Sequence, residues 1–303
     1  MAHAVWCAFL LRRGRTYIRN NHLALIALMV AVAGVPTAWA LGRNSVGSKE
    51  LQPDSVGGSE LKDNSVRSPE VNDGSLLPRD LACEGNGAAD EMVQAPTVCI
   101  DKYEASVWSQ PNGGTQLVTE AQIDAACPDN GQSCEGTIFA RSVQGVAPAR
   151  DITWFQAMAA LANSGKRLPT NAEWQQAVTG TPGNPPAPGS EDCNTDSAAV
   201  EPAGERDGCK SDAGANDMIG NVSEWVADWD QQSTQGCASF SVNTGFEGDR
   251  VCIGDDGGGV AAPLIRGGDF DDDDGAGAMM VDARVLPFQS TALSLVVGFR
   301  GAR

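Results

Sequence analysis

The chain has 303 residues, of which 42% are hydrophobic, and 21 Lys+Arg against 39 Asp+Glu give a formal charge of -18. This length can bury one sizeable core or two small ones, and nothing in the composition indicates a chain that is disordered throughout. The acidic surplus argues against nucleic acid as a partner, because phosphate binding needs a basic surface, and favours metal cations or polar ligands.

Residues 1–40 have the features of an export signal. A basic segment over 12–19 precedes an apolar run over 23–35 and a small-x-small cleavage pattern at 38–40. An uncleaved membrane anchor is the alternative, although the apolar run is shorter than the ~20 residues of a span. In both cases we expect the rest of the chain outside the cytoplasm, secreted or at the cell surface, with no other membrane contact.

Cleavage after residue 40 would remove His3 and His22, the only two histidines. The mature chain would then contain no histidine, which excludes Ser-His-Asp and Cys-His catalysis and any metal centre with histidine ligands.

Residues 41–81 contain a repeat with a period of ten residues, which reads NSVGSKEL, DSVGGSEL, NSVRSPEV and DGSLLPRDL. One unit cannot bury its two apolar positions alone, so the segment predicts a stalk that stacks or forms a homo-oligomer. A polar, disordered spacer is the alternative. The repeat resembles decad segments that follow signal sequences in exported actinobacterial proteins, which implies no activity.

Eight cysteines follow the signal, in the globular part over residues 82–303. An even number in an exported chain predicts disulfides, and no C-x-x-C pair indicates zinc. The sequence does not fix the connectivity, but pairing between neighbours would close a local loop each time. We therefore expect Cys83–Cys99, Cys127–Cys134, Cys193–Cys209 and Cys237–Cys252.

Two helices are predicted in the globular part. The first should begin near Asp151 or Thr153, carry apolar residues at i, i+3, i+4 and i+7 from Phe155, and end at Gly165. The second opens with the capping-box pattern TNAE at 170–173.

Alternation over residues 220–229 predicts a strand that packs Trp225 and Trp229 into the core, and residues 295–303 predict another strand. Glu224 lies on the opposite face from these tryptophans. It then needs a partner, because an unpaired carboxylate beside apolar side chains is costly.

Five motifs occur in a fixed order: VCIDKYEAS (98–106), DITWFQAMAALANSGKRLPTNAEWQQAV (151–178), GANDMIGNVSEWVADW (214–229), LIRGGDF (264–270) and VGFRGAR (297–303). Together they resemble formylglycine-generating enzyme, or sulfatase-modifying factor, domains over about residues 92–303. The resemblance implies an α+β, C-type-lectin-like fold, rich in loops, with two helices and a small twisted mixed or antiparallel sheet.

Structural calcium is a further implication of the resemblance. Calcium takes roughly six to eight oxygen ligands from carboxylates, amides and carbonyls, which these loops can supply. The alternative is that the acids only cap turns. The implied ligands are Asp217, Glu224 and the carbonyls of Gly220 and Val222 for one site, and Asn194, the Thr195 carbonyl and Asp207 for a second.

Catalytic members of the family carry two copper-binding cysteines after an Arg-Gly-Gly and oxidise a substrate cysteine. Here Asp272 and Gly277 stand at the corresponding positions, so copper is not expected, because hard carboxylates do not suit monovalent copper. The surrounding acids form either an exposed rim or a weak divalent-cation or ligand loop: Asp269, Asp271, Asp272, Asp273 and Asp274.

Three functions stay open at this point. The sequence favours an exported, non-catalytic domain that binds an unidentified ligand or partner, polar or protein, through its loops. An enzyme with a remodelled site, acting on cysteine or another substrate, is the second, since one fold hosts many functions. A structural cap on a multimerising stalk is the third.

Overall fold

The computed structural model describes residues 83, 85, 87, 89–183, 193–234, 236–241, 245–254, 259–292 and 295–303. The expected signal (1–40) and repeat (41–81) therefore lie outside the described residues. In the part that the structure describes, no helix combines the length and the apolar character needed to cross a membrane.

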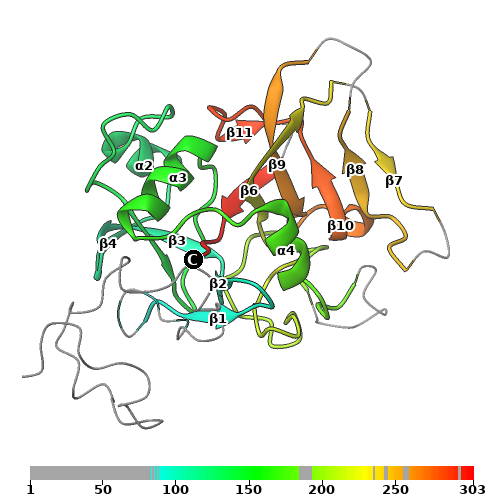
Figure 1. The fold of residues 1–303 in the computed structure, drawn as a ribbon, viewed down its shortest axis with the longest axis horizontal. Coiled ribbons are helices and arrows are strands. Elements are labelled where there is room, and N and C mark those ends of the chain that lie inside the picture. Colours follow the sequence, from blue (N-terminus) through cyan, green and yellow to red (C-terminus); the bar gives the residue numbers. More distant parts are fainter. Residues whose placement is uncertain are drawn as a thin grey trace, which may run out of the picture. The chain divides into compact units, whose positions relative to one another are not determined.

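The strands among the described residues form three sheets (Figure 1). In the largest, β12 lies parallel to β6 and β10 lies parallel to β8, while the remaining neighbours are antiparallel. Its order is β11 (Thr291–Ala292), β12 (Leu295–Phe299), β6 (Ser223–Gln231), β9 (Ala261–Gly267), β10 (Gly277–Asp282), β8 (Arg250–Cys252) and β7 (Ala238–Ser239). The smaller sheets are β1 (Met92–Gln94) with β2 (Cys99–Asp101), and β4 (Gly113–Leu117), β3 (Ala105–Gln110) and β5 (Phe139–Ser142).

Each of the three α-helices in the described part of the chain begins with a capping box, in which a threonine side chain and the side chain three residues later exchange hydrogen bonds with the backbone. The two predicted helices start at the predicted caps, Thr153 and Thr170. One helix, α2, was not predicted, because it has seven residues and buries a single apolar side chain, Ile123. The helices are α2 (Glu120–Ala126), α3 (Trp154–Asn163) and α4 (Asn171–Ala177).

Strands β6 and β9 separate two hydrophobic cores. Trp225 and the opposing Ile265 belong to the first core, whereas the next residues along, Val226 and Leu264, belong to the second. This division follows from strand geometry, in which successive side chains point to opposite faces. Helix α3 packs against β5, and α4 packs against β6 (Figure 1).

The sequence-based core assignment is wrong at Trp229, which is 39% exposed, whereas Trp225 is fully buried. The pairing of β6 with β9 shifts register between these two tryptophans, so the alternation that would put both on one face is interrupted. The predicted face of α3 is also displaced, because Ala157, Ala160 and Leu161 are the buried apolar residues of this helix.

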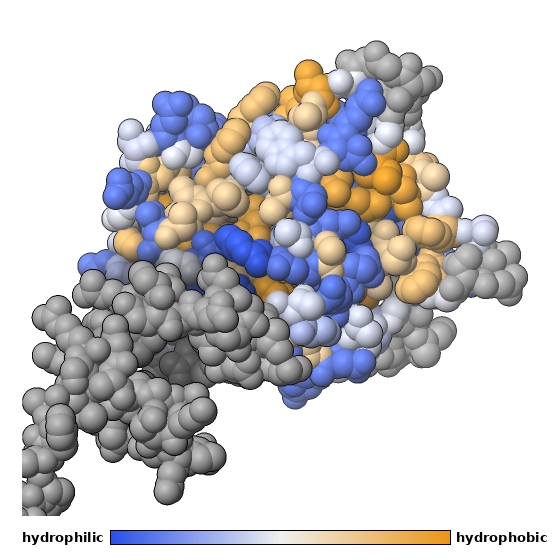
Figure 2. Space-filling view, viewed as in Figure 1, coloured by the Kyte–Doolittle hydropathy of each residue, from blue (hydrophilic) through white to orange (hydrophobic). Residues whose placement is uncertain are grey.

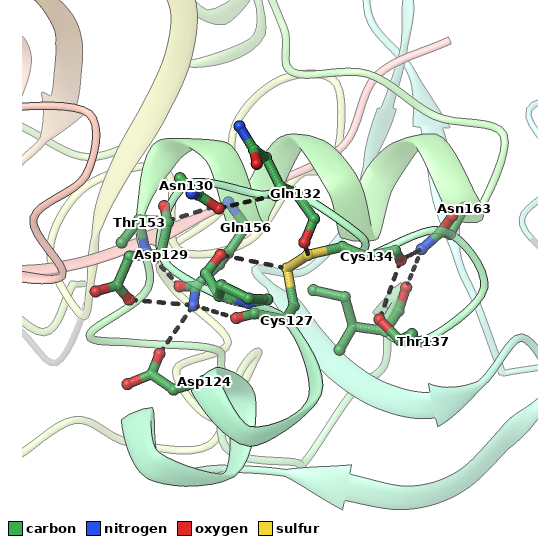
Figure 3. Close-up of a disulfide and its surroundings, with 12 residues drawn as sticks. Asp124, Cys127, Asp129, Asn130, Gln132, Cys134, Thr137, Thr153, Gln156 and Asn163 are labelled. Carbon is green, nitrogen blue, oxygen red and sulfur yellow. Dashed lines mark hydrogen bonds between the residues drawn. A yellow bond between two sulfur atoms is a disulfide. The ribbon is translucent and has the colours of Figure 1, made fainter.

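All four predicted disulfides are present, with Cα–Cα distances from 4.5 to 5.4 Å. The shortest loop, Cys127–Cys134, lies against α3 (Figure 3). The Gln156 amide donates to the Cys127 carbonyl over 2.8 Å, and the Asn163 amide donates to the Cys134 carbonyl over 2.7 Å. Two side chains of one helix thus hold both ends of the disulfide loop.

Candidate functional site

A fully buried arginine, Arg300, is the centre of a polar cluster directly after β12. Its Nε lies 2.8 Å from each carboxylate oxygen of Glu224. Nη1 donates to the Asp101 carbonyl over 3.0 Å, and Nη2 donates to the carbonyls of Asn216 and Asp217 over 2.8 and 3.1 Å. The guanidinium therefore joins β2, the loop before β6, and β6 itself.

Three carboxylates surround this one guanidinium: Glu104, Asp217 and Glu224, all buried. Glu104 accepts from the Val222 amide over 3.0 Å. Burial raises the pKa of Glu104 well above its usual value, and the charges of Asp217 and Glu224 raise it further. Burial also raises the pKa of Asp217 to about 6. The cluster holds more acid than base, which is costly unless protons or a cation balance it.

The first predicted calcium set fits this cluster in part. Glu224 is committed to Arg300 and also accepts from Trp174 Nε1 over 2.7 Å. Asp217 is buried, with one carboxylate oxygen 2.6 Å from the Gly204 amide. Beside it, both polar atoms of the buried Asn216 side chain lack a hydrogen-bond partner within the described ranges. An unused amide oxygen next to a buried acid suits a hard cation.

The second predicted set does not fit as a cation site. Asn194 Oδ1 accepts from the Arg206 guanidinium over 3.2 Å, and the Thr195 carbonyl accepts from the Asp273 amide over 2.7 Å. The Asp207 side chain is 92% exposed and lies 3.3 Å from Lys210. The structure does bring Asn194 into contact with the first loop, because it pairs with Gly220.

The acidic run is divided between core and surface. Asp271, Asp273 and Asp274 are exposed, as a rim would be. Asp269 is 1% exposed, and its carboxylate accepts from the amides of Asp271 and Val296 over 3.1 and 2.9 Å. The rim interpretation is wrong for this residue because the chain turns after it. The Asp272 amide donates to the Asp269 carbonyl over 3.3 Å, and a 3-10 helix follows over Asp273–Gly275, so the acids of the run point in different directions.

Asp272 is the second acid of the run that is not part of an exposed rim. Arg250 binds its carboxylate with two contacts, Nη1 to Oδ1 over 2.5 Å and Nη2 to Oδ2 over 2.8 Å. Among the residues described, no group of three or more acidic or cysteine side chains is arranged to hold a metal ion. The Arg250 guanidinium therefore balances the charge of Asp272.

Sequence reasoning missed Asp249, whose side chain lies against Gly277. A Cβ atom added at Gly277 would lie 2.0 Å from Asp249 Oδ1, so no larger residue fits there without movement. Asp249 is 2% exposed, and its Oδ2 accepts from the Met279 amide over 2.7 Å. Only the parallel pairing of β8 with β10 brings it there, and no local pattern signals that pairing.

Residues 128–303 match the model of the sulfatase-modifying factor enzyme 1-like domain. The chain belongs to this family. The matched segment contains α3, α4 and all strands from β5 to β12, and hence Arg300, the acidic run and Asp249. The α+β, C-type-lectin-like fold expected from the motifs is therefore the fold of this sulfatase-modifying factor domain, with three helices where two were expected.

Among solved structures, the domain is similar to the Major Tropism Determinant P3c variant, with 18% identity, a TM-score of 0.40, and coverage of 72% of this chain and 54% of that one. The M1 variant has 17% identity and a TM-score of 0.42, with coverage of 72% of this chain and 54% of that one. This chain therefore spans about half the length of the tropism determinants. The structure of CarF has 15% identity and a TM-score of 0.35, with coverage of 72% of this chain and 96% of that one. No curated protein matches the chain.

Replacement of Arg300 by methionine should destabilise the domain by about 3–5 kcal/mol, because Glu224 would stay buried without its charge partner. Urea denaturation measures the loss. Arg167→Met is the control, since this residue pairs with Glu173 at the surface with its side chain 46% exposed, and such pairs contribute about 1 kcal/mol or less. Equal losses in the two variants would contradict the assigned importance of Arg300.

Stability should fall as the pH rises from about 4 to 7. Burial raises the pKa values of Asp249 and Asp269 from 3.8 to about 6. A folded pKa above the unfolded one gives stabilisation that is complete below the unfolded pKa and is lost as the pH passes the folded pKa. Melting temperatures across this range test it, and Asp249→Asn should flatten the profile. A profile that rises with pH in both proteins would refute it.

Proposed function

We propose that this chain is an exported, non-catalytic member of the sulfatase-modifying factor family that binds a ligand or partner through its loops. The observation that carries the proposal is the identity and surroundings of the residues at the two positions where the family resemblance implies copper-binding cysteines, Asp272 and Gly277. Asp249 lies against Gly277, and Arg250 binds Asp272. Copper does not fit this place, because carboxylates and a guanidinium replace soft thiolates.

The remaining cysteines offer no substitute for the missing thiolates. All eight cysteines of the globular part are bonded in pairs. A disulfide sulfur is neither a nucleophile nor a good metal ligand, since both roles need the thiolate. The same four disulfides support an oxidising, extracytoplasmic location, with the predicted stalk holding the domain away from the envelope.

The remodelled enzyme is the second candidate, because carboxyl groups with a pKa of about 6 are the kind that general acid or base catalysis uses. Asp249 and Asp269 are however only 2% and 1% exposed. Both also accept hydrogen bonds from backbone amides. A substrate would reach them only after the surrounding loops moved, so burial and structural hydrogen bonds favour the binding function.

The purified protein should not convert a sulfatase-type cysteine peptide to formylglycine, with or without copper, as measured by mass spectrometry of the peptide. A catalytic family member serves as the positive control. The double variant Asp272→Cys, Gly277→Cys should also stay inactive, because Asp249 occupies the space of the second thiol. Copper-dependent oxidation by the unmodified protein above a no-protein control would contradict the proposal.

We also propose a structural calcium ion held by Asp217 and the carbonyls of Gly220 and Val222, with Glu224 kept by Arg300. Two observations support it: three buried carboxylates surround one guanidinium, and the side-chain amide of Asn216 lacks a hydrogen-bond partner among the described residues. Calcium at a hundredfold excess over its dissociation constant should then stabilise the domain by about 2.7 kcal/mol, and Asp217→Asn should abolish most of this gain.

Thermal melts with calcium, chelator or magnesium measure the effect of the ion. Asp207→Asn is the control, because this side chain is exposed and should not affect the response. If calcium leaves the melting temperature unchanged and elemental analysis finds none bound, the calcium proposal is wrong.

A further inference from the structure

Three aromatic side chains gather where α3 meets β6, and we call them the aromatic shelf: Trp154, Phe155 and Trp229. The Trp154 ring makes edge-on contacts with Trp229 and Phe155, with centroids 5.2 and 5.5 Å apart. Phe288 follows Pro287, whose carbonyl accepts from the Trp154 amide over 3.1 Å. The shelf rings thus come from two segments of the chain, and a backbone hydrogen bond holds the 287–288 segment beside the first of them.

The shelf is open to solvent and held in place from below. Trp229 is 39% exposed although it is large and apolar, and Phe288 in the neighbouring 287–288 segment is 53% exposed. Trp154 Nε1 donates to the Val226 carbonyl over 2.9 Å, which fixes its ring. In Figure 2 the surface between α3 and β6 is pale to orange, while that over α2 includes strongly hydrophilic side chains. Exposed aromatic clusters of this kind mark interaction sites.

Elsewhere in the domain, aromatic rings are paired with cations of the same chain. Lys102 lies 5.0 Å from the Tyr103 ring, Arg141 5.4 Å from Trp108, and Arg266 4.6 Å from Trp174. Within the described ranges no lysine or arginine is placed over Trp154 or Trp229. Because an edge-on contact occupies at most one face of a ring, the exposed indole of Trp229 can accept a cation from outside.

Acidic side chains lie around the start of α3, the helix that carries Trp154. The side chain of Gln156, two residues after Trp154 on α3, donates to the Asp124 carboxylate over 2.8 Å, and Asp151 precedes Trp154 by three residues. Ser290, two residues after Phe288, donates to the Glu120 carboxylate. Arg150 offsets part of this charge, but the chain as a whole has a formal charge of -18. A positively charged ligand would therefore be attracted over a distance and held at the rings.

We propose that the aromatic shelf binds the lysine or arginine side chains of a basic polypeptide partner. This inference rests on the proposed function, because it names the surface and the class of partner for a binding domain. Cation–π contact with Trp229 supplies the local attraction, and the carboxylates around the start of α3 select positive charge over neutral ligands. The shelf uses side chains from α3 and β6, and none from the acidic run or from Asp249.

The test titrates the full exported protein with a short oligolysine peptide and follows tryptophan fluorescence and heat. Binding should weaken as salt increases, and Trp229→Leu should weaken it by about fivefold or more, whereas Trp229→Phe should keep most of it. Phe246→Leu is the matched control, because Phe246 is also 39% exposed but lies between β7 and β8. Melting curves establish that each variant is folded.

A second pair of variants tests the charges. Asp151→Asn should lower the affinity by about twofold or more, and it suits the left-handed backbone of this residue, at φ 54°. Asp207→Asn removes the same charge from an exposed side chain outside the patch and should change little.

Two outcomes would overturn the proposal. Equal binding by the protein and its folded Trp229→Leu variant would mean that only bulk negative charge attracts the peptide. Binding of a neutral oligosaccharide that depends on Trp229, without binding of oligolysine, would assign the shelf to carbohydrate. Neither outcome bears on peptide oxidation, so failure of this inference is distinguishable from failure of the proposed function.

Discussion

The buried pair between Arg300 and Glu224 is the interaction on which the rest of the domain depends. Removing two charges from water is expensive, and the cost is offset only when the remaining donors and acceptors are also satisfied. Arg300 meets this condition by binding the carbonyls of Asp101, Asn216 and Asp217. One side chain near the C-terminus therefore fixes a small sheet, a central strand and the loop between them, and this loop in turn positions the acids of the cluster.

The same requirement explains how a run of five acids in six positions can fold. The turn separates the acids, so that three remain in water and two enter the protein. Arg250 balances Asp272, and backbone amides hold Asp269. The segment around β8 supplies both Arg250 and the neighbouring Asp249, and the Cys237–Cys252 disulfide ties this segment to β7. At the two positions for which the family resemblance implies copper-binding cysteines, Asp272 pairs with Arg250 and Gly277 lies against Asp249.

Two regions of the domain differ in their exposure to solvent, and this difference is consistent with a binding function. Asp249 and Asp269 are sheltered from solvent, while Trp229 is exposed at a patch built from other segments. Burial raises the pKa of both carboxyl groups, so the stability of the domain depends on pH. The exposed rings keep hydrophobic area and open faces available to a ligand. A rigid scaffold with open aromatic side chains at loop and strand ends is the usual arrangement of a recognition surface.

The sequence by itself determined what depends on short separations along the chain. Disulfides that span 7 to 16 residues and the capping boxes at Thr153 and Thr170 are local, and the ordered motifs identified the family. Tertiary structure alone decided the rest. A register shift against β9 turned Trp229 outward, and the parallel pairing of β8 with β10 brought Asp249 to Gly277. These outcomes depend on strands that are distant in sequence, and alternation within one segment contains no information about which strand it will pair with or in what register.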